Sequence, residues 1–85
     1  MRQPNVTVYG SLTCPDTTRA LAFLGEHSVP YEFKDVDAVP EYGAYIAGLN
    51  GGKRVMPTLQ IDNQAYINPS VDELARALDD AAAAR

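Results

Sequence analysis

Cys14 is the residue whose type and position most directly suggest chemistry, and it is the only cysteine of the chain. It stands between Thr13 and Pro15, after a short strand-like run and before a helix that Pro15 is suited to begin. A sulfur at a helix N-terminus lies beside unpaired N–H groups and the positive end of the helix dipole, which stabilise a thiolate. We therefore expect its pKa to fall below about 8.5, the value for a free cysteine. A small buried apolar residue is the common alternative for a single cysteine.

Hydrophobic patterning predicts the elements that must position this cysteine. Strands are expected at 6–9, 31–36, 58–61 and 65–67, with a tight turn joining the last two as an antiparallel hairpin. Helices are expected from Pro15 to about His27, from Pro40 to Leu49, and from Val71 onward, each with a 3.6-residue apolar period. The expected inward faces are Thr17, Ala20, Leu21 and Leu24, then Tyr42, Tyr45, Ile46 and Leu49, then Val71, Leu74, Ala75 and Leu78. The tail from Ala81 to Arg85 is expected to fray.

The predicted order of elements is βαβαββα, an α/β arrangement. The first strand, helix and second strand form a right-handed parallel crossover, and the hairpin completes a four-stranded mixed sheet. Three helices should flank this sheet and cover both of its faces. With 85 residues we expect one domain, 1–85, whose core spans 6–78.

The composition argues against several functions. Seven basic and eleven acidic residues give a net charge of −4, which disfavours general binding to nucleic acid or to an anionic membrane. No apolar run approaches the roughly 20 residues of a membrane span, and the N-terminus lacks the apolar stretch of a signal peptide. One cysteine permits no internal disulfide, so a reducing cytoplasm is the expected compartment. No cluster has metal-ligand spacing, and we expect neither a metal nor a cofactor.

Two stretches resemble the glutaredoxin family, whose fold is the thioredoxin fold. The run from Val6 to Tyr9, followed by Cys14-Pro15-Asp16-Thr17, is similar to the family's first strand, tyrosine and active-site loop. The run from Asn50 to Leu59 is similar to the stretch that leads to its obligatory cis-proline. The resemblance extends from Val6 to about Leu78. It implies that Tyr9, Pro15, Asp16 and Thr17 support a catalytic Cys14.

The resemblance also assigns roles around the proline. It implies that Pro57 is cis and packs beside Cys14. The backbone N–H and C=O of Met56 would then receive a thiol substrate as an added strand would. Filling a gap in the core is the alternative role for the Met56 side chain. Lys53 and Arg54 would pair with a carboxylate of that substrate, or simply form a solvated turn.

The start of the last helix is a further candidate binding site. Ser70 and Glu73 have the spacing of a capping box, which satisfies the helix start from within the chain. The N–H groups from Ser70 through Val71 to Asp72 would also suit an anion, such as a substrate carboxylate. The two roles can coexist because capping uses only some of these groups.

Several positions depart from the family pattern. Thr17 stands where dithiol members carry a second cysteine, so an internal dithiol mechanism is excluded. Asp16 brings a negative charge that opposes thiolate formation, while the helix start favours it. Ser11 replaces a common lysine, and Asn68-Pro69 replaces a Gly-Gly pair, both of which serve glutathione in the family. The identity of the small thiol is therefore open.

We predict a glutaredoxin-like thiol–disulfide oxidoreductase with a monothiol mechanism, working as a monomer. Its co-substrate would be glutathione or another low-molecular-weight thiol, and its targets would be proteins carrying disulfides or bound thiols. One alternative is a binding module that kept the fold and lost catalysis. A weaker alternative is an iron–sulfur carrier formed by two chains and two external thiols. His27, the only histidine, lies about three helical turns from Cys14 and is not expected to act as its base.

Overall fold

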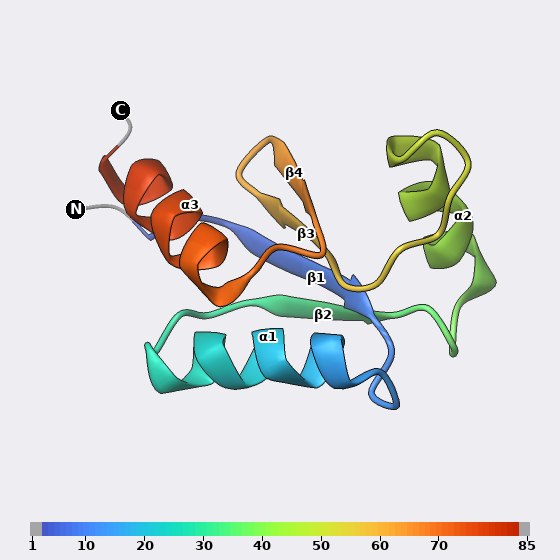
Figure 1. Cartoon of the computed structure of the whole chain (residues 1–85), viewed down its shortest axis with the longest axis horizontal. Coiled ribbons are helices and arrows are strands. Elements are labelled where there is room, and N and C mark those ends of the chain that lie inside the picture. Colours follow the sequence, from blue (N-terminus) through green and yellow to red (C-terminus); the bar gives the residue numbers. More distant parts are fainter. Residues whose placement is uncertain (1–2, 84–85) are drawn as a thin grey trace.

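The computed structural model describes residues 3–83, and its elements follow the predicted order βαβαββα. The strands are β1 (Val6–Gly10), β2 (Glu32–Asp35), β3 (Thr58–Ile61) and β4 (Gln64–Ile67). The helices are α1 (Pro15–Glu26), α2 (Pro40–Leu49) and α3 (Val71–Ala83) (Figure 1). None of the helices within residues 3–83 combines the length and the apolar character that a membrane crossing requires.

The sheet has the strand order β2-β1-β3-β4. As predicted, β1 pairs with β2 in parallel, and β3 and β4 form an antiparallel hairpin. β1 also pairs with β3 antiparallel, so the sheet is mixed. Because β1 and β3 are central, Val8 and Leu59 are fully buried, as β-branched and aliphatic residues of a two-sided sheet should be.

Alternation along the strands sends side chains to two separate apolar clusters. Val6 and Val8 face one way, where α1 and α3 cover them with Leu24 and Leu74. Tyr9 faces the other way, toward Val36 and the α2 residue Ile46. Helices therefore cover both faces, as predicted, and Figure 1 shows α2 set apart from α1 and α3.

The predicted inward face of α2 is only partly correct. Ile46 is fully buried, but Tyr45 and Leu49 are 45% and 40% exposed. The physical reason is that, within residues 3–83, α2 is the helix that packs on this face, and its broad apolar stripe has no second helix there to cover its flanks. Within α2, Gly43 lies against Arg54: an added Cβ there would lie 2.9 Å from the Cδ of Arg54.

The predicted face of α3 also needs correction. Val71 is 39% exposed, and Ala77 is buried together with Leu74 and Leu78. Side chains in a helix lean toward its N-terminus, so the first residue of α3 points beyond the packed surface. The helix continues through Ala83, where fraying was expected; Ala84 and Arg85 lie outside the described residues.

Candidate functional site

Cys14 occupies the N-cap position of α1, and Pro15 is the first helical residue. The backbone of Cys14 is extended, with φ −93° and ψ 119°, and its side chain makes no capping hydrogen bond. Its N–H donates to the carbonyl of Ser11 at 3.0 Å, and its own carbonyl accepts the first helical bond, from Thr18, at 3.1 Å. The residue is partly exposed. The sulfur thus lies at a helix start, as the sequence predicts. It makes no hydrogen bond that caps the helix.

Hydrogen-bond donors at this helix start lower the pKa of the Cys14 thiol. The largest cause is the backbone N–H of Thr17, followed by the Thr17 side chain, and the N–H of Asp16 contributes further. Burial and the Asp16 carboxylate oppose the shift. The donors prevail, which settles the competition that the sequence leaves open. Asp16 also forms a 2.7 Å ion pair with Arg19.

Thr17 has both a packing role and a role at the sulfur. It is fully buried on the inner face of α1, and its hydroxyl also stabilises the thiolate. Its Oγ1 accepts a hydrogen bond from the N–H of Ser11 at 3.4 Å. This packing requires Gly10, because a Cβ there would lie only 2.5 Å from Thr17 Oγ1. Sequence reasoning missed Gly10, although a glycine that ends a buried strand signals close approach of another chain segment.

The loop before β3 faces the sulfur from the other side. The Met56–Pro57 peptide bond is cis, which is the isomer that the resemblance implies. The thiol of Cys14 lies 3.9 Å from the Met56 carbonyl oxygen. Pro57 is fully buried, and its carbonyl accepts a hydrogen bond from Asn68 at 2.8 Å. The Met56 side chain packs on the α2-side apolar cluster, so Met56 both fills the core and borders the site.

Tyr9 belongs to the packing beneath α2. It is 7% exposed, and its ring contacts those of Tyr42 and Tyr45, with centroids at 6.0 and 5.3 Å. Its hydroxyl donates to Gln60 at 3.4 Å, and burial raises its pKa. Its connection to the site runs through Met56, which packs on the same cluster.

The cations Lys53 and Arg54 are both exposed on the segment that leads to Met56. The guanidinium of Arg54 lies over Gly43 of α2, as the close approach there shows. The backbone N–H of Lys53 donates to Asn50 at 3.0 Å and closes the turn through Gly51 and Gly52.

The start of α3 is a fully formed capping box, as the spacing predicts. The N–H of Ser70 donates to Glu73 Oε1 at 2.8 Å, and the N–H of Glu73 donates to Ser70 Oγ at 3.1 Å. These hydrogen bonds lower the pKa of Glu73. The helix start therefore already holds a carboxylate, beside a half-exposed Val71.

Two polar links around Cys14 were missed by sequence reasoning. Asn68 Nδ2 donates to Asp16 Oδ2 at 3.4 Å and connects the β4–α3 loop to the first turn of α1. Ser11, considered only as a departure from a lysine, is 2% exposed and hydrogen-bonds Asp37 and Thr13. The signal for this second link is the parallel pairing, which places the residues after β1 and β2 at the same edge of the sheet.

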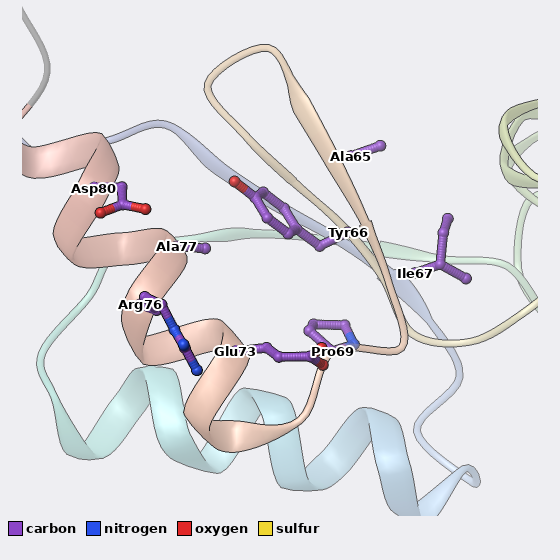
Figure 2. Close-up of a pocket in the computed structure, with 8 residues that line it drawn as sticks. All are labelled: Ala65, Tyr66, Ile67, Pro69, Glu73, Arg76, Ala77 and Asp80. Carbon is purple, nitrogen blue, oxygen red and sulfur yellow. The ribbon is translucent and has the colours of Figure 1, made fainter.

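Other features lie apart from this sulfur. A shallow pocket between β4 and α3, shown in Figure 2, is lined by Ala65, Tyr66, Ile67, Pro69, Glu73, Arg76, Ala77 and Asp80. His27 is exposed at the end of α1, where its ring lies 4.2 Å from that of Phe23. Within residues 3–83, no group of three or more His, Cys, Asp or Glu side chains is arranged to hold a metal.

A cysteine that begins a helix and has a lowered pKa is suited to thiol–disulfide exchange. This cysteine lies within the parallel β1–α1–β2 crossover, and the β3–β4 hairpin follows the loop that contains Pro57. The arrangement places the chain in the class of thioredoxin-fold redox proteins. Residues 6–66 match the Glutaredoxin family, and the chain belongs to that family. It is a glutaredoxin-like thiol–disulfide oxidoreductase, as the sequence predicts.

Individual relatives agree with this placement. Mycoredoxin 1 from Corynebacterium glutamicum is 29% identical over 76 residues, which cover 88% of this chain and 94% of the relative. A glutaredoxin from Archaeoglobus fulgidus superposes with a TM-score of 0.77 at 20% identity, over 87% of this chain and 85% of its own. NrdH-redoxin from Escherichia coli superposes with a TM-score of 0.69 at 22% identity, over 85% of this chain and 92% of its own. These superpositions confirm the predicted glutaredoxin-like fold.

Proposed function

We propose that the chain reduces mixed disulfides between target proteins and a low-molecular-weight thiol by a monothiol mechanism at Cys14. One observation carries the proposal: the sulfur sits uncapped at the start of α1, where Thr17 lowers its pKa. The absence of a second cysteine leaves an external thiol as the resolving group. The lowered pKa also argues against the binding-module alternative, for which an ordinary thiol would suffice.

The reaction consists of two thiol–disulfide exchanges. The Cys14 thiolate attacks the small-thiol sulfur of the mixed disulfide, and the target protein leaves as a thiolate. A second small-thiol thiolate then attacks the Cys14 adduct, which forms the small-molecule disulfide and restores the Cys14 thiolate. In the net reaction one free small thiol is oxidised, the target sulfur is reduced to a thiolate, and the small-thiol group taken from the target ends in the small-molecule disulfide. Thr17, by stabilising the thiolate, also makes Cys14 a good leaving group in the second exchange.

The cis-proline loop is proposed to hold the small thiol. The Met56 carbonyl, 3.9 Å from the sulfur, lies where an adduct on Cys14 would run. Its backbone would pair with that adduct as an added strand would. Lys53 and Arg54 are the cations of the same segment and would attract a substrate carboxylate. The start of α3, at Ser70 and Val71, is the weaker candidate because Glu73 already holds a negative charge there.

The small thiol is proposed to be glutathione or mycothiol, the latter suggested by the similarity to mycoredoxin. Glutathione carries two carboxylates, whereas the first turn of α1 presents the carboxylate of Asp16. This arrangement favours a thiol with little negative charge close to its sulfur. We also propose that the protein acts as a monomer in a reducing cytoplasm, where one unpaired cysteine persists as a thiol.

The test is the intact mass of the reduced protein after incubation with each small-molecule disulfide. We expect one adduct per chain, removed by an excess of the corresponding thiol, and none on Cys14→Ser. Comparison of the two disulfides identifies the preferred thiol. If a small neutral disulfide also leaves the wild-type mass unchanged, Cys14 does not exchange and the proposal is wrong.

A further inference from the structure

The hydrogen bonds of Ser11 join the active-site loop to a carboxylate that follows a different strand. Ser11 Oγ contacts Asp37 Oδ2, and it lies 2.8 Å from Thr13 Oγ1. The N–H of Thr13 donates to the same Ser11 Oγ at 3.3 Å. Asp37 is held there because Gly10 pairs with Asp35 at the end of the parallel ladder. A nearly buried hydroxyl thus links two loops at the edge of the sheet that carries Cys14.

The chemistry of these groups fixes the direction of the bonds. An ionised carboxylate only accepts, so the Ser11 hydroxyl donates its hydrogen to Asp37. Ser11 Oγ is then an acceptor toward Thr13, and the hydroxyl of Thr13 must donate to it. The backbone N–H and the hydroxyl of Thr13 therefore both donate to Ser11 Oγ, which fixes the residue directly before Cys14.

The backbone of Ser11 extends the same arrangement to the sulfur. Its carbonyl accepts the N–H of Cys14 at 3.0 Å, and its N–H donates to Thr17 Oγ1 at 3.4 Å. Because Thr17 Oγ1 accepts from Ser11, its own hydrogen remains available to Cys14. Ser11 is thus bonded to residues on both sides of the sulfur along the chain.

We propose that Asp37 is a positioning residue for the thiol chemistry, which acts through Ser11 to hold the loop that presents donors to Cys14. Asp37 is not among the groups that shift the pKa of Cys14, whereas the carboxylate of Asp16 raises that pKa. The contribution of Asp37 is as a hydrogen-bond acceptor, because its charge would by itself oppose thiolate formation. The inference rests on the proposed function, since it concerns the same sulfur.

A pair of neutral variants separates the two properties of Asp37. Asp37→Asn and Asp37→Ala both remove the charge, but only Asn keeps an acceptor for the Ser11 hydroxyl. The readout is the pH dependence of Cys14 alkylation by iodoacetamide, an uncharged reagent whose encounter rate does not depend on local charge. We expect Asp37→Ala to react about threefold more slowly than Asp37→Asn near neutral pH, with a higher apparent pKa. As a control, Asp79→Ala removes an exposed carboxylate of α3, and its alkylation rate should equal that of the wild type.

A second variant tests the route through Ser11. Ser11→Ala should slow alkylation as Asp37→Ala does, and adding Asp37→Ala to it should change nothing further, because one linkage has been cut twice. Equal rates for Asp37→Ala and Asp37→Asn, or additive effects in the double variant, would overturn the inference. If Asp37→Ala does not fold by circular dichroism, Ser11→Ala against Ser11→Thr, which keeps the hydroxyl, decides the same question. Failure of this inference can be told from failure of the proposed function. The proposed function is tested by small-thiol adducts on the wild type, and the alkylation rates of the variants can be measured whether or not those adducts form.

Discussion

The N-termini of α1 and α3 are built from similar parts and are used differently. At α3, Ser70 and Glu73 cap each other, and the helix start is satisfied by its own chain. At α1, Cys14 occupies the cap position, yet its side chain makes no cap bond, and nearby donors lower its pKa instead. The difference shows that a helix start becomes reactive when its donors are left for a thiolate, not merely because the helix has a dipole.

The largest effect is expected when the cysteine is moved from the start of α1 to the start of α3. Cys14→Ser should abolish reduction of a mixed-disulfide substrate, because a serine hydroxyl is not a nucleophile under these conditions. Adding Ser70→Cys should not restore turnover, since Glu73 places a carboxylate at that start and the Met56 carbonyl lies beside the sulfur of Cys14 at α1. Steady-state reduction, followed through consumption of the small thiol, measures both variants. Turnover by the relocated cysteine would show that any helix start suffices.

Gly10→Ala attacks the packing that places Thr17 under the sulfur. The new Cβ would lie 2.5 Å from Thr17 Oγ1, so Thr17 and the first turn of α1 must shift. We expect a loss of about 1–3 kcal/mol in the free energy of unfolding, measured by urea denaturation, because overpacking strains a filled core. Cys14 alkylation should slow as well.

The matched control for this substitution is Gly25→Ala. Gly25 lies in α1, and an added Cβ would meet nothing within 4 Å. This variant should be unchanged or more stable by up to about 1 kcal/mol, because alanine favours a helix. Equal destabilisation by the two substitutions would mean that the Gly10–Thr17 contact is unimportant.

Thr17→Val removes the hydroxyl donor beside Cys14 while keeping the shape of the side chain. The hydroxyl is the second cause of the lowered Cys14 pKa, and the larger one, the backbone N–H of Thr17, remains. The pKa should rise, and the alkylation rate near neutral pH should fall about threefold to tenfold. Thr18→Val removes an exposed hydroxyl that donates to Pro15 and should leave the rate unchanged. An unaltered pKa in Thr17→Val would assign the whole effect to the backbone.

Ser70→Ala tests the satisfied helix start and should have the smallest effect. Loss of the cap should cost about 1 kcal/mol in the free energy of unfolding at neutral pH, without changing Cys14 alkylation. The pKa of Glu73 is lowered in the folded chain by its bonds to Ser70. Its stabilisation is therefore present above about 4.3, the pKa of an unperturbed glutamate, and is lost as pH falls through the lowered value. The difference between wild type and variant should shrink in acid; a constant difference would contradict the capping role of Glu73.

Most of the fold was predictable because local patterns and topology agree. The strands, the hairpin, the parallel crossover and the capping box follow from alternation, turn residues and side-chain spacing. The exposure of Tyr45, Leu49 and Val71 was not predictable, because periodicity gives the apolar stripe of a helix and not the extent of the surface that covers it.

The candidate site was predictable in part. The helix-start position of Cys14 follows from the strand, the proline and the helix around it. The balance between Asp16 and the donors does not, because it depends on distances that only the folded loop defines. Gly10 and Asp37 escaped notice for the same reason: their contacts with Thr17 and Ser11 form only when the ends of β1 and β2 meet.

The most direct test of the account is the pKa of Cys14 in the wild-type protein, measured from the pH dependence of its alkylation by iodoacetamide. We expect a single inflection below about 8.5, the pKa of a free cysteine, with the rate level at higher pH. The same measurement on the urea-unfolded chain should return the free value. An inflection in the folded protein at or above that value would contradict the claim that the start of α1 is built to hold a thiolate.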